Sequence, residues 1–149
     1  MRNVADMADR ETRDSQNVVT ALGERNLNPL VVDTGAGASR AVLEMIPEGA
    51  EVHSGKSKTL EDIGLFREFQ DSGRYDFVRT RMFAMDRATE GREIRKLIAA
   101  PDYMVSSAQA ITEDGVLLVA STSASQVGPL ASGAGRVIFG VGSQKIVRS

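Results

Sequence analysis

The chain has 149 residues, of which 42% are hydrophobic and 26% are charged, and these values suit one globular domain with its own core. It contains no cysteine, which excludes disulfides, thiolate zinc sites and iron–sulfur clusters held by this chain. A formal net charge of -2 argues against general affinity for nucleic acid or an anionic membrane. We expect a cytoplasmic protein, because no apolar run approaches the roughly 20 residues of a membrane helix and the N-terminus lacks the apolar stretch of a signal peptide.

The N-terminal part of the chain alternates helical and extended patterns. Residues 1–14 form a polar lead-in, expected as a frayed segment or an extra helical turn, and the domain itself is expected over residues 15–149. After a first helix, the apolar run at 30–33 indicates a short buried strand. Apolar residues at i, i+3, i+4, i+7 and i+8 then predict a helix over 38–46.

The alternation continues through the middle of the chain. Strands are predicted at 50–54, 76–79 and 102–108, and helices are predicted between them at 59–70 and 87–99. Strands that alternate with helices in this way favour a parallel sheet that is covered on both faces.

The last third of the chain has a different pattern. Residues 111–121 are typical of a β-hairpin, with Asp114-Gly115 supplying the tight turn. A polar stretch at 122–135, with one short helix, leads to a final strand at 136–142.

These elements predict a three-layer, Rossmann-like α/β fold with a mainly parallel sheet. The strand residues expected in its core are Val31, Val32, Val52, Phe77, Val105, Leu118, Val137, Ile138 and Phe139. Ligands of such sheets usually bind beyond the carboxyl ends of the strands. The residues that directly follow 50–54, 116–120 and 136–142 are therefore site candidates.

The segment after the strand at 50–54 combines a glycine with hydroxyl and lysine side chains. Gly55 permits a tight bend, and Ser57 or Thr59 can cap the following helix, with Asp62 three residues after Thr59. The segment is interpreted either as a cradle for phosphate or carboxylate, or as an ordinary capped helix start with solvated lysines.

Two other strand ends carry polar candidates. Ser121, Thr122 and Gln126 belong to a hydroxyl-rich run that can donate hydrogen bonds to a carboxylate or phosphate, or can form a plain polar loop. Lys145 follows the last strand and is either a point charge near the cleft or a solvated or ion-paired lysine. We expect Gly55, Ser57, Thr59, Ser121, Thr122, Gln126 and Lys145 to line one cleft.

Other motifs are weaker. His53, the only histidine, ends a strand and is either a general base or a packed or exposed residue. Glu113 could point into a cleft, although the turn explains its neighbours without any chemistry. The run 35–40 begins like a dinucleotide-binding loop but lacks its third glycine, so a flexible loop is the alternative. No Ser–His–Asp arrangement is visible, and a Ser–Lys nucleophile stays open without any one serine being singled out.

Three stretches together carry a family resemblance: IPEGAEVHSGKSKTLEDIGL (46–65), ITEDGVLLVAS (111–121) and GRVIFGVGSQKIV (135–147). In this order they resemble the LUD domain, the module named for bacterial lactate-utilization proteins, and in particular its short stand-alone members. The resemblance implies a sheet of the NagB/RpiA/CoA-transferase-like type, with ligands on Gly/Ser-rich loops at strand ends. The positions that match the family's motifs are Gly55, Ser57, Thr59, Glu113 and Lys145.

The resemblance also implies a functional setting. LUD proteins of the lactate system act beside iron–sulfur subunits that oxidize L-lactate to pyruvate, and a chain without cysteine fits a subunit without clusters. Iron–sulfur protein subunits and a small carboxylate or phosphate are therefore the expected partners. No cofactor or metal is expected in this chain, and its association into a homo-oligomer stays open.

This chain departs from the family pattern after the hairpin. Residues 120–126 replace the N-x-D-G-x-G-N-R-like run of many LUD proteins, which weighs against direct lactate chemistry. Relatives usually continue into another helix beyond the position of Ser149, so we expect some apolar sheet surface for a partner to cover. The chain is thus interpreted as an accessory, ligand-binding component of lactate utilization. The alternative is a stand-alone enzyme of the NagB/RpiA/CoA-transferase-like superfamily that acts on a small carboxylate, CoA thioester or sugar phosphate.

Overall fold

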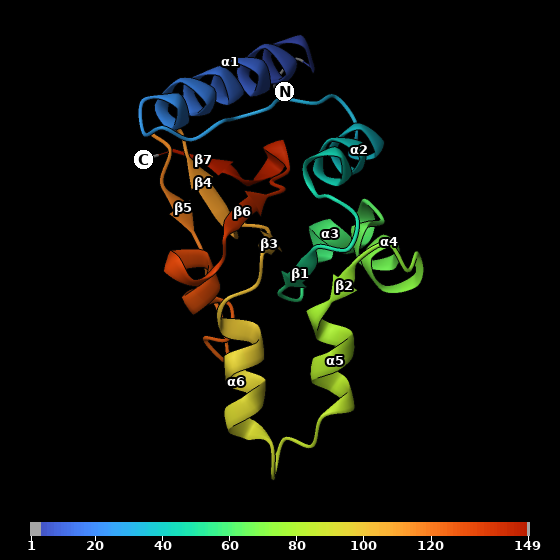
Figure 1. Ribbon diagram of the computed structural model, residues 1–149. Helices are drawn as coiled ribbons and strands as arrows, with labels where there is room; N and C mark the ends of the chain where they lie inside the picture. The colour runs from blue at the N-terminus through green and yellow to red at the C-terminus, as the bar shows by residue number, and fades with distance from the viewer. Residues whose placement is uncertain (1–3, 149) are drawn as a thin grey trace. The chain divides into compact units, whose positions relative to one another are not determined.

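The computed structural model describes residues 4–148, and the side chains of residues 14–148. Its contacts divide the chain into two compact units (Figure 1). The larger unit contains Asp33–Ser107 and Ser121–Gly140, and the smaller unit combines the N-terminal helix with Ala108–Ala120 and the segment from Val141 onward. Among the described residues, no helix is long and apolar enough to cross a membrane.

The larger unit is built on a parallel four-stranded sheet in the order β2-β1-β3-β6. Its strands are β1 (Glu51–Ser54), β2 (Asp76–Phe77), β3 (Tyr103–Ser106) and β6 (Arg136–Phe139). Val52 of β1 lies opposite Phe77 on one side and Tyr103 on the other. This sheet and its flanking helices confirm the predicted Rossmann-like α/β fold with a mainly parallel sheet.

Helices cover this sheet through two apolar clusters. The helical elements of the unit are α2 (Gly35–Met45), α3 (Lys58–Asp62), α4 (Leu65–Asp71), α5 (Val78–Ala84), α6 (Gly91–Ala99) and the π-helical turn η1 (Pro129–Gly133). One cluster packs α2, α3 and α4 on the strands through Leu60, Leu65 and Phe69, each of which stabilises the fold by roughly 1.5–3 kcal/mol through burial. The other joins α5 and α6, which lie side by side (Figure 1), through Val78, Met82, Ile94 and Ile98.

The smaller unit contains α1 (Val4–Gly23) and a three-stranded sheet in the order β5-β4-β7. Its strands are β4 (Ala110–Thr112), β5 (Leu117–Leu118) and β7 (Ile146–Val147), and the 3-10 turn η2 (Ser143–Lys145) precedes β7. The antiparallel pair β4–β5 confirms the predicted hairpin, and Gly115 adopts a φ of 83° that favours glycine in its turn. Because α1 begins at Val4, most of the lead-in is helical, and residues 1–3 lie outside the described residues.

The predicted core is right for three strands of the parallel sheet. Val52, Phe77 and Val105 are all buried, and they belong to the cluster that packs under α2, α3 and α4. The buried strand predicted at 30–33 is wrong, because this run connects α1 to α2 without pairing, and Val31 is 63% exposed. Val32 is exposed as well. A short apolar run does not reveal whether it has a strand to pair with.

The remaining core predictions fail at the edges of the two sheets. Leu118 is 60% exposed on the edge strand β5, and Val137 is exposed on the edge strand β6. Ile138 and Phe139 are partly buried, because β6 has a neighbour on one side only within its sheet. The predicted strand at 136–142 ends at Phe139 and is followed by a second strand, β7, in the other unit.

One helix prediction and one strand prediction also need correction. The helix predicted at 59–70 is interrupted at Gly64, whose φ of 80° ends α3 and begins α4. The strand predicted at 76–79 stops at Phe77, and Val78 already begins α5, which the sequence did not indicate. This second correction matters for the site, because it places Arg79 on a helix rather than in a strand.

Candidate functional site

Polar residues gather at the carboxyl edge of the larger unit's sheet, where β1 and β3 end. Ser54 closes β1 opposite Val105, so Gly55 and the residues that follow β3 come to the same edge. Ser106 and Ser107 end β3 there, and both are buried. Hydroxyl groups from two neighbouring strands are therefore buried at this edge.

Gln126 lies directly over Gly55. A Cβ atom built on Gly55 would lie 2.1 Å from Oε1 of Gln126, so only a glycine leaves room for this amide. The hydroxyl of Ser106 donates to the same Oε1 at 3.5 Å. A residue from a distant loop is thus held between the ends of β1 and β3, in contact with Gly55, and ligand binding by these two candidates stays a prediction.

Ser57 and Thr59 have different roles at the start of α3. The hydroxyl of Ser57 accepts a hydrogen bond from the backbone N–H of Leu60 at 3.3 Å, which is the capping role that the sequence offered as one alternative. The hydroxyl of Thr59 accepts from that of Ser107 at 3.4 Å, so Thr59 links α3 to the end of β3. Gly55, Thr59 and Gln126 are therefore brought to one edge, together with the serines of β3.

His53 and Ser54 are buried beneath this edge. His53 is 3% exposed and Ser54 is fully buried, and neither Nδ1 of His53 nor Oγ of Ser54 has a hydrogen-bond partner among the described residues. Burial, with the nearby charge of Arg79, lowers the pKa of His53 to about 4. A neutral, buried imidazole of this kind is a weak base at neutral pH, which supports the packing interpretation over the general-base one.

Arg79 lies next to this pair and was not a candidate in the sequence. Its guanidinium carbon lies 5.2 Å from the ring centroid of Phe66 and 5.0 Å from that of Phe83. One of its nitrogens donates to the carbonyl oxygen of Ser54 at 3.4 Å. Burial lowers the pKa of Arg79, while the charge of Glu61 acts in the opposite direction.

Other candidates are not joined to this edge by any described contact. Ser121 and Thr122 belong to the same unit as Gln126, but among the described residues no hydrogen bond links their side chains to Gly55 or its neighbours. The serines of their loop that do interact are Ser123 and Ser125, whose hydroxyls lie 2.9 Å apart.

Glu113 and Lys145 belong to the smaller unit. The backbone N–H of Glu113 donates to the carbonyl of Val147 at 3.1 Å, which ties the hairpin to β7. The ammonium group of Lys145 donates to the carbonyl of Ala108 at 2.8 Å. Both residues thus have contacts within their own unit; the prediction that Lys145 shares one cleft with Gly55, and the suggestion that Glu113 points into a cleft, stay predictions.

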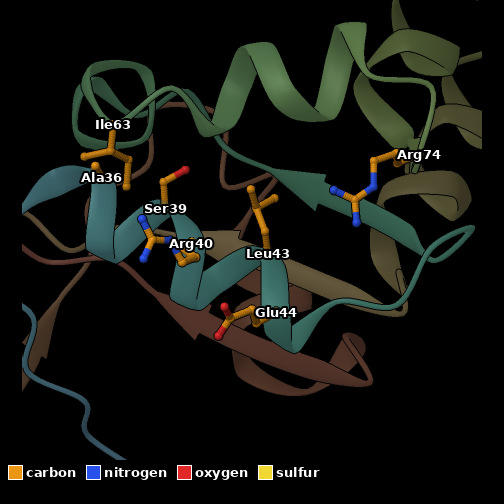
Figure 2. Close-up of a pocket in the computed structure, with 7 residues that line it drawn as sticks. All are labelled: Ala36, Ser39, Arg40, Leu43, Glu44, Ile63 and Arg74. Carbon is orange, nitrogen blue, oxygen red and sulfur yellow. The ribbon is translucent and has the colours of Figure 1, made fainter.

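A separate surface hollow of about 510 Å³ lies beside α2 (Figure 2). Figure 2 shows Ser39, Arg40 and Glu44 on α2 and Arg74 on the far side of the hollow. Arg74 is already paired with Glu48 at 3.0 Å. The glycine-rich run 35–40 forms the start of this helix and follows no strand, because Thr34 caps α2 directly, so both the dinucleotide-binding loop and the flexible loop are wrong.

The missed residues had a signal in the sequence. Ser106 ends β3 and Ser107 follows it, so the strand-end rule points to Ser107 once the strand predicted at 102–108 is shortened to its observed end. Arg79 had no such signal, because a strand was expected where α5 begins. Among the described residues, no group of three or more histidine, aspartate or glutamate side chains could hold a metal ion.

Comparison with known families places this geometry in context. No curated protein matches the chain. The family model of the LUD domain matches residues 15–149, nearly the whole chain, which confirms the resemblance found in the three sequence motifs. The chain therefore belongs to the LUD-domain family, which associates it with lactate utilization at the level of the family.

Proposed function

We propose that this chain is an accessory, ligand-binding component of lactate utilization, and that it binds a small carboxylate at the carboxyl edge around Gly55. The observation that carries the proposal is the amide of Gln126 packed on Gly55 between the ends of β1 and β3. Ligands of open α/β sheets usually bind beyond the carboxyl ends of the strands, which is where this edge lies. Membership in the LUD-domain family supplies the lactate setting.

The chemistry of the edge suits a small 2-hydroxy or 2-keto acid. Hydroxyl groups and an amide can each donate and accept, so Ser106, Ser107, Thr59 and Gln126 can meet both the carboxylate and the neighbouring hydroxyl or ketone oxygen. These four side chains do not include a general base, and His53, which lies beneath them, is buried and has a lowered pKa. Binding without turnover by the isolated chain follows from this arrangement.

Oxidation of L-lactate to pyruvate removes two electrons and two protons, and another protein must accept the electrons in this proposal. The chain has no cysteine with which to hold an iron–sulfur cluster of its own. Iron–sulfur protein subunits are therefore the partners we propose. The chain would present the substrate, and the partner would carry the electrons away.

Binding is tested by ligand-observed NMR with L-lactate and with pyruvate, using the wild-type chain, Gln126→Ala and Gln70→Ala. Gln70 is an exposed glutamine on α4 and is the matched control. Loss of the Gln126 amide should weaken binding by about tenfold, equivalent to about 1.4 kcal/mol, whereas Gln70→Ala should bind as the wild type does. Equal binding by all three chains would contradict the site.

The accessory role is tested by lactate-dependent dye reduction, measured with and without an iron–sulfur partner. We expect no dye reduction by the chain alone, and reduction when the partner is present. Turnover of a CoA thioester or sugar phosphate by the isolated, cofactor-free chain would instead select the alternative of a stand-alone enzyme. That alternative predicts a nucleophile, and Ser54, beside Gly55, is one of two buried hydroxyls without a described partner, the other being Tyr75.

A further inference from the structure

We propose that Arg79 is the anion-binding residue of this edge and that it selects a carboxylate monoanion. The inference deepens the proposed function and rests on it for the location of the ligand. It assigns a group in the larger unit that would neutralise the ligand's charge, which the hydroxyl cluster of Thr59, Ser106 and Ser107 does not provide.

Arg79 is held in one orientation by its surroundings. Its guanidinium group lies within cation–π distance of both Phe66 and Phe83, at 5.2 and 5.0 Å from their centroids. The hydrogen bond to the carbonyl of Ser54 adds a third contact. A guanidinium fixed in this way loses little side-chain entropy when it binds a planar anion.

The charge of Arg79 is not neutralised within the described structure. Among the residues whose side chains are described, no carboxylate lies within ion-pair distance of it, and Glu61 acts on it only from farther away. A partly buried cation is usually paired, because removing it from water is costly. Of the five N–H donors of the guanidinium, one donates to the carbonyl of Ser54, so the others can donate to a ligand.

Two nearby cations are already paired within the protein, whereas Lys56, directly after Gly55, is exposed. Lys58 is paired with Asp62, and Arg81 is paired with Glu51 and with Asp76. A phosphate dianion would need a second cation close to Arg79, and the charge of Glu61 opposes a dianion more strongly than a monoanion. A carboxylate matches both the single charge and the forked geometry of the guanidinium.

Arg79 is continuous with the hydroxyl cluster through the backbone of β1. It contacts the carbonyl of Ser54, and the next residue, Gly55, is the one that Gln126 covers. A small 2-hydroxy acid bound along this edge could therefore place its carboxylate on the guanidinium and its hydroxyl toward the amide. The ends of β1 and β3 would then recognise both functional groups of one molecule.

The test titrates the full chain with sodium pyruvate, L-lactamide and inorganic phosphate, and follows backbone amide NMR shifts. L-lactamide keeps the hydroxyl group of lactate but has no negative charge. The variants are Arg79→Lys, which keeps the charge and loses the planar fork, and Phe83→Leu, which removes one stacking ring. Phe83 is 60% exposed, so its replacement should leave the fold intact. Arg92→Lys is the matched control, since Arg92 is an exposed residue of α6.

We expect pyruvate to bind more tightly than phosphate, and L-lactamide to bind at least about tenfold more weakly than pyruvate. Arg79→Lys should weaken pyruvate binding by at least about tenfold, Phe83→Leu by a few-fold, and Arg92→Lys not at all.

Pyruvate binding that is lost in Gln126→Ala but unchanged in Arg79→Lys would overturn the role of Arg79 and leave the proposed function standing. If pyruvate shifts the backbone amides of Arg79 and Phe83 alone, and Gln126→Ala binds pyruvate as the wild type does, the anion-binding role of Arg79 is supported and the site around Gly55 is overturned. Tighter binding of phosphate than of pyruvate would overturn the selectivity, and no binding of any probe would overturn both proposals.

Discussion

The two edges of the parallel sheet differ in whether their arginine side chains are paired with carboxylates of the protein. At the amino edge, Arg81 pairs with Glu51 and with Asp76, and the backbone N–H of Glu51 donates to a carboxylate oxygen of Asp102 at 3.2 Å. At the carboxyl edge, Arg79, only two residues before Arg81, lies between aromatic rings without a described carboxylate partner. The ion pairs of the amino edge are supplied by the protein itself, although the hydroxyl of Tyr75, just before β2, is buried there without a described partner, and Arg79 at the carboxyl edge keeps capacity for a ligand.

This difference teaches how to separate structural from functional polar residues. A group whose partners are all supplied by the chain contributes to stability alone, whereas a buried group without a partner carries a cost that folding by itself does not explain. His53 and Ser54 both carry such a cost at the carboxyl edge. Substitutions at this edge should therefore affect binding or pH dependence, and substitutions at the amino edge should affect stability.

The largest expected effect concerns His53 and pH. Its folded pKa of about 4 lies below the ordinary value of 6.5, so the unfolded chain binds the proton more readily. The stability that this residue contributes is fully present above about pH 6.5 and is lost as the pH falls toward 4, by up to about 3 kcal/mol. Urea unfolding at several pH values should show this slope in the wild type and a flatter one in His53→Gln. Parallel slopes for the two proteins between pH 6.5 and 5 would refute the assignment.

The next effect concerns Gly55. An alanine there would place its Cβ on the amide of Gln126, and the flexible end of that side chain would move away. We expect Gly55→Ala to remain folded, with the free energy of unfolding changed by less than about 1 kcal/mol, and to bind pyruvate about tenfold more weakly. Calorimetric titration measures the affinity and thermal unfolding measures the stability. If Gly55→Ala bound pyruvate with unchanged affinity but lost much of its stability, the carboxyl edge would have a structural role rather than a binding role.

At the amino edge, Arg81→Gln should show the opposite behaviour. It removes two partly exposed ion pairs, so we expect a loss of about 0.5–1 kcal/mol in the free energy of unfolding, reduced at high salt. Pyruvate affinity should stay within twofold of the wild type. A tenfold loss of affinity in this variant would mean that the amino edge also takes part in binding.

The smallest effect is expected for Ser54→Ala. This change removes a buried hydroxyl that has no described partner, so stability should change by less than about 0.5 kcal/mol or should rise slightly. Chemical denaturation gives the comparison with the wild type. A loss of more than about 1.5 kcal/mol would show that the hydroxyl is satisfied in solution.

The sequence predicts the parallel sheet and some residues of the candidate carboxyl edge because both depend on local patterns. Gly55 and Thr59 directly follow a strand that apolar residues make easy to recognise, and the strand-end rule then gives their location. Gln126 was found for a similar reason, although the strand before it is only Leu117–Leu118. The rule would have found Ser107 as well, had it been applied to the strand that ends at Ser106.

What the sequence does not predict depends on long-range contacts. Arg79 is significant because of its two aromatic neighbours, and Phe66 comes from a helix that precedes β2 along the chain. Val31 and Val137 look like core residues, but one has no strand to pair with and the other lies on an edge strand. Pairing and edge position are properties of the assembled sheet, and apolar periodicity does not contain them.

The most direct test of the contrast between the two edges is a map of backbone amide shifts on addition of sodium pyruvate. The account predicts that the largest shifts occur at Gly55, Ser107 and Gln126, and that the amides of Glu51 and Asp76 stay unchanged. The shifts should saturate with a single affinity, because one site is proposed. Largest shifts at the amino edge, or no shift at either edge, would contradict the account.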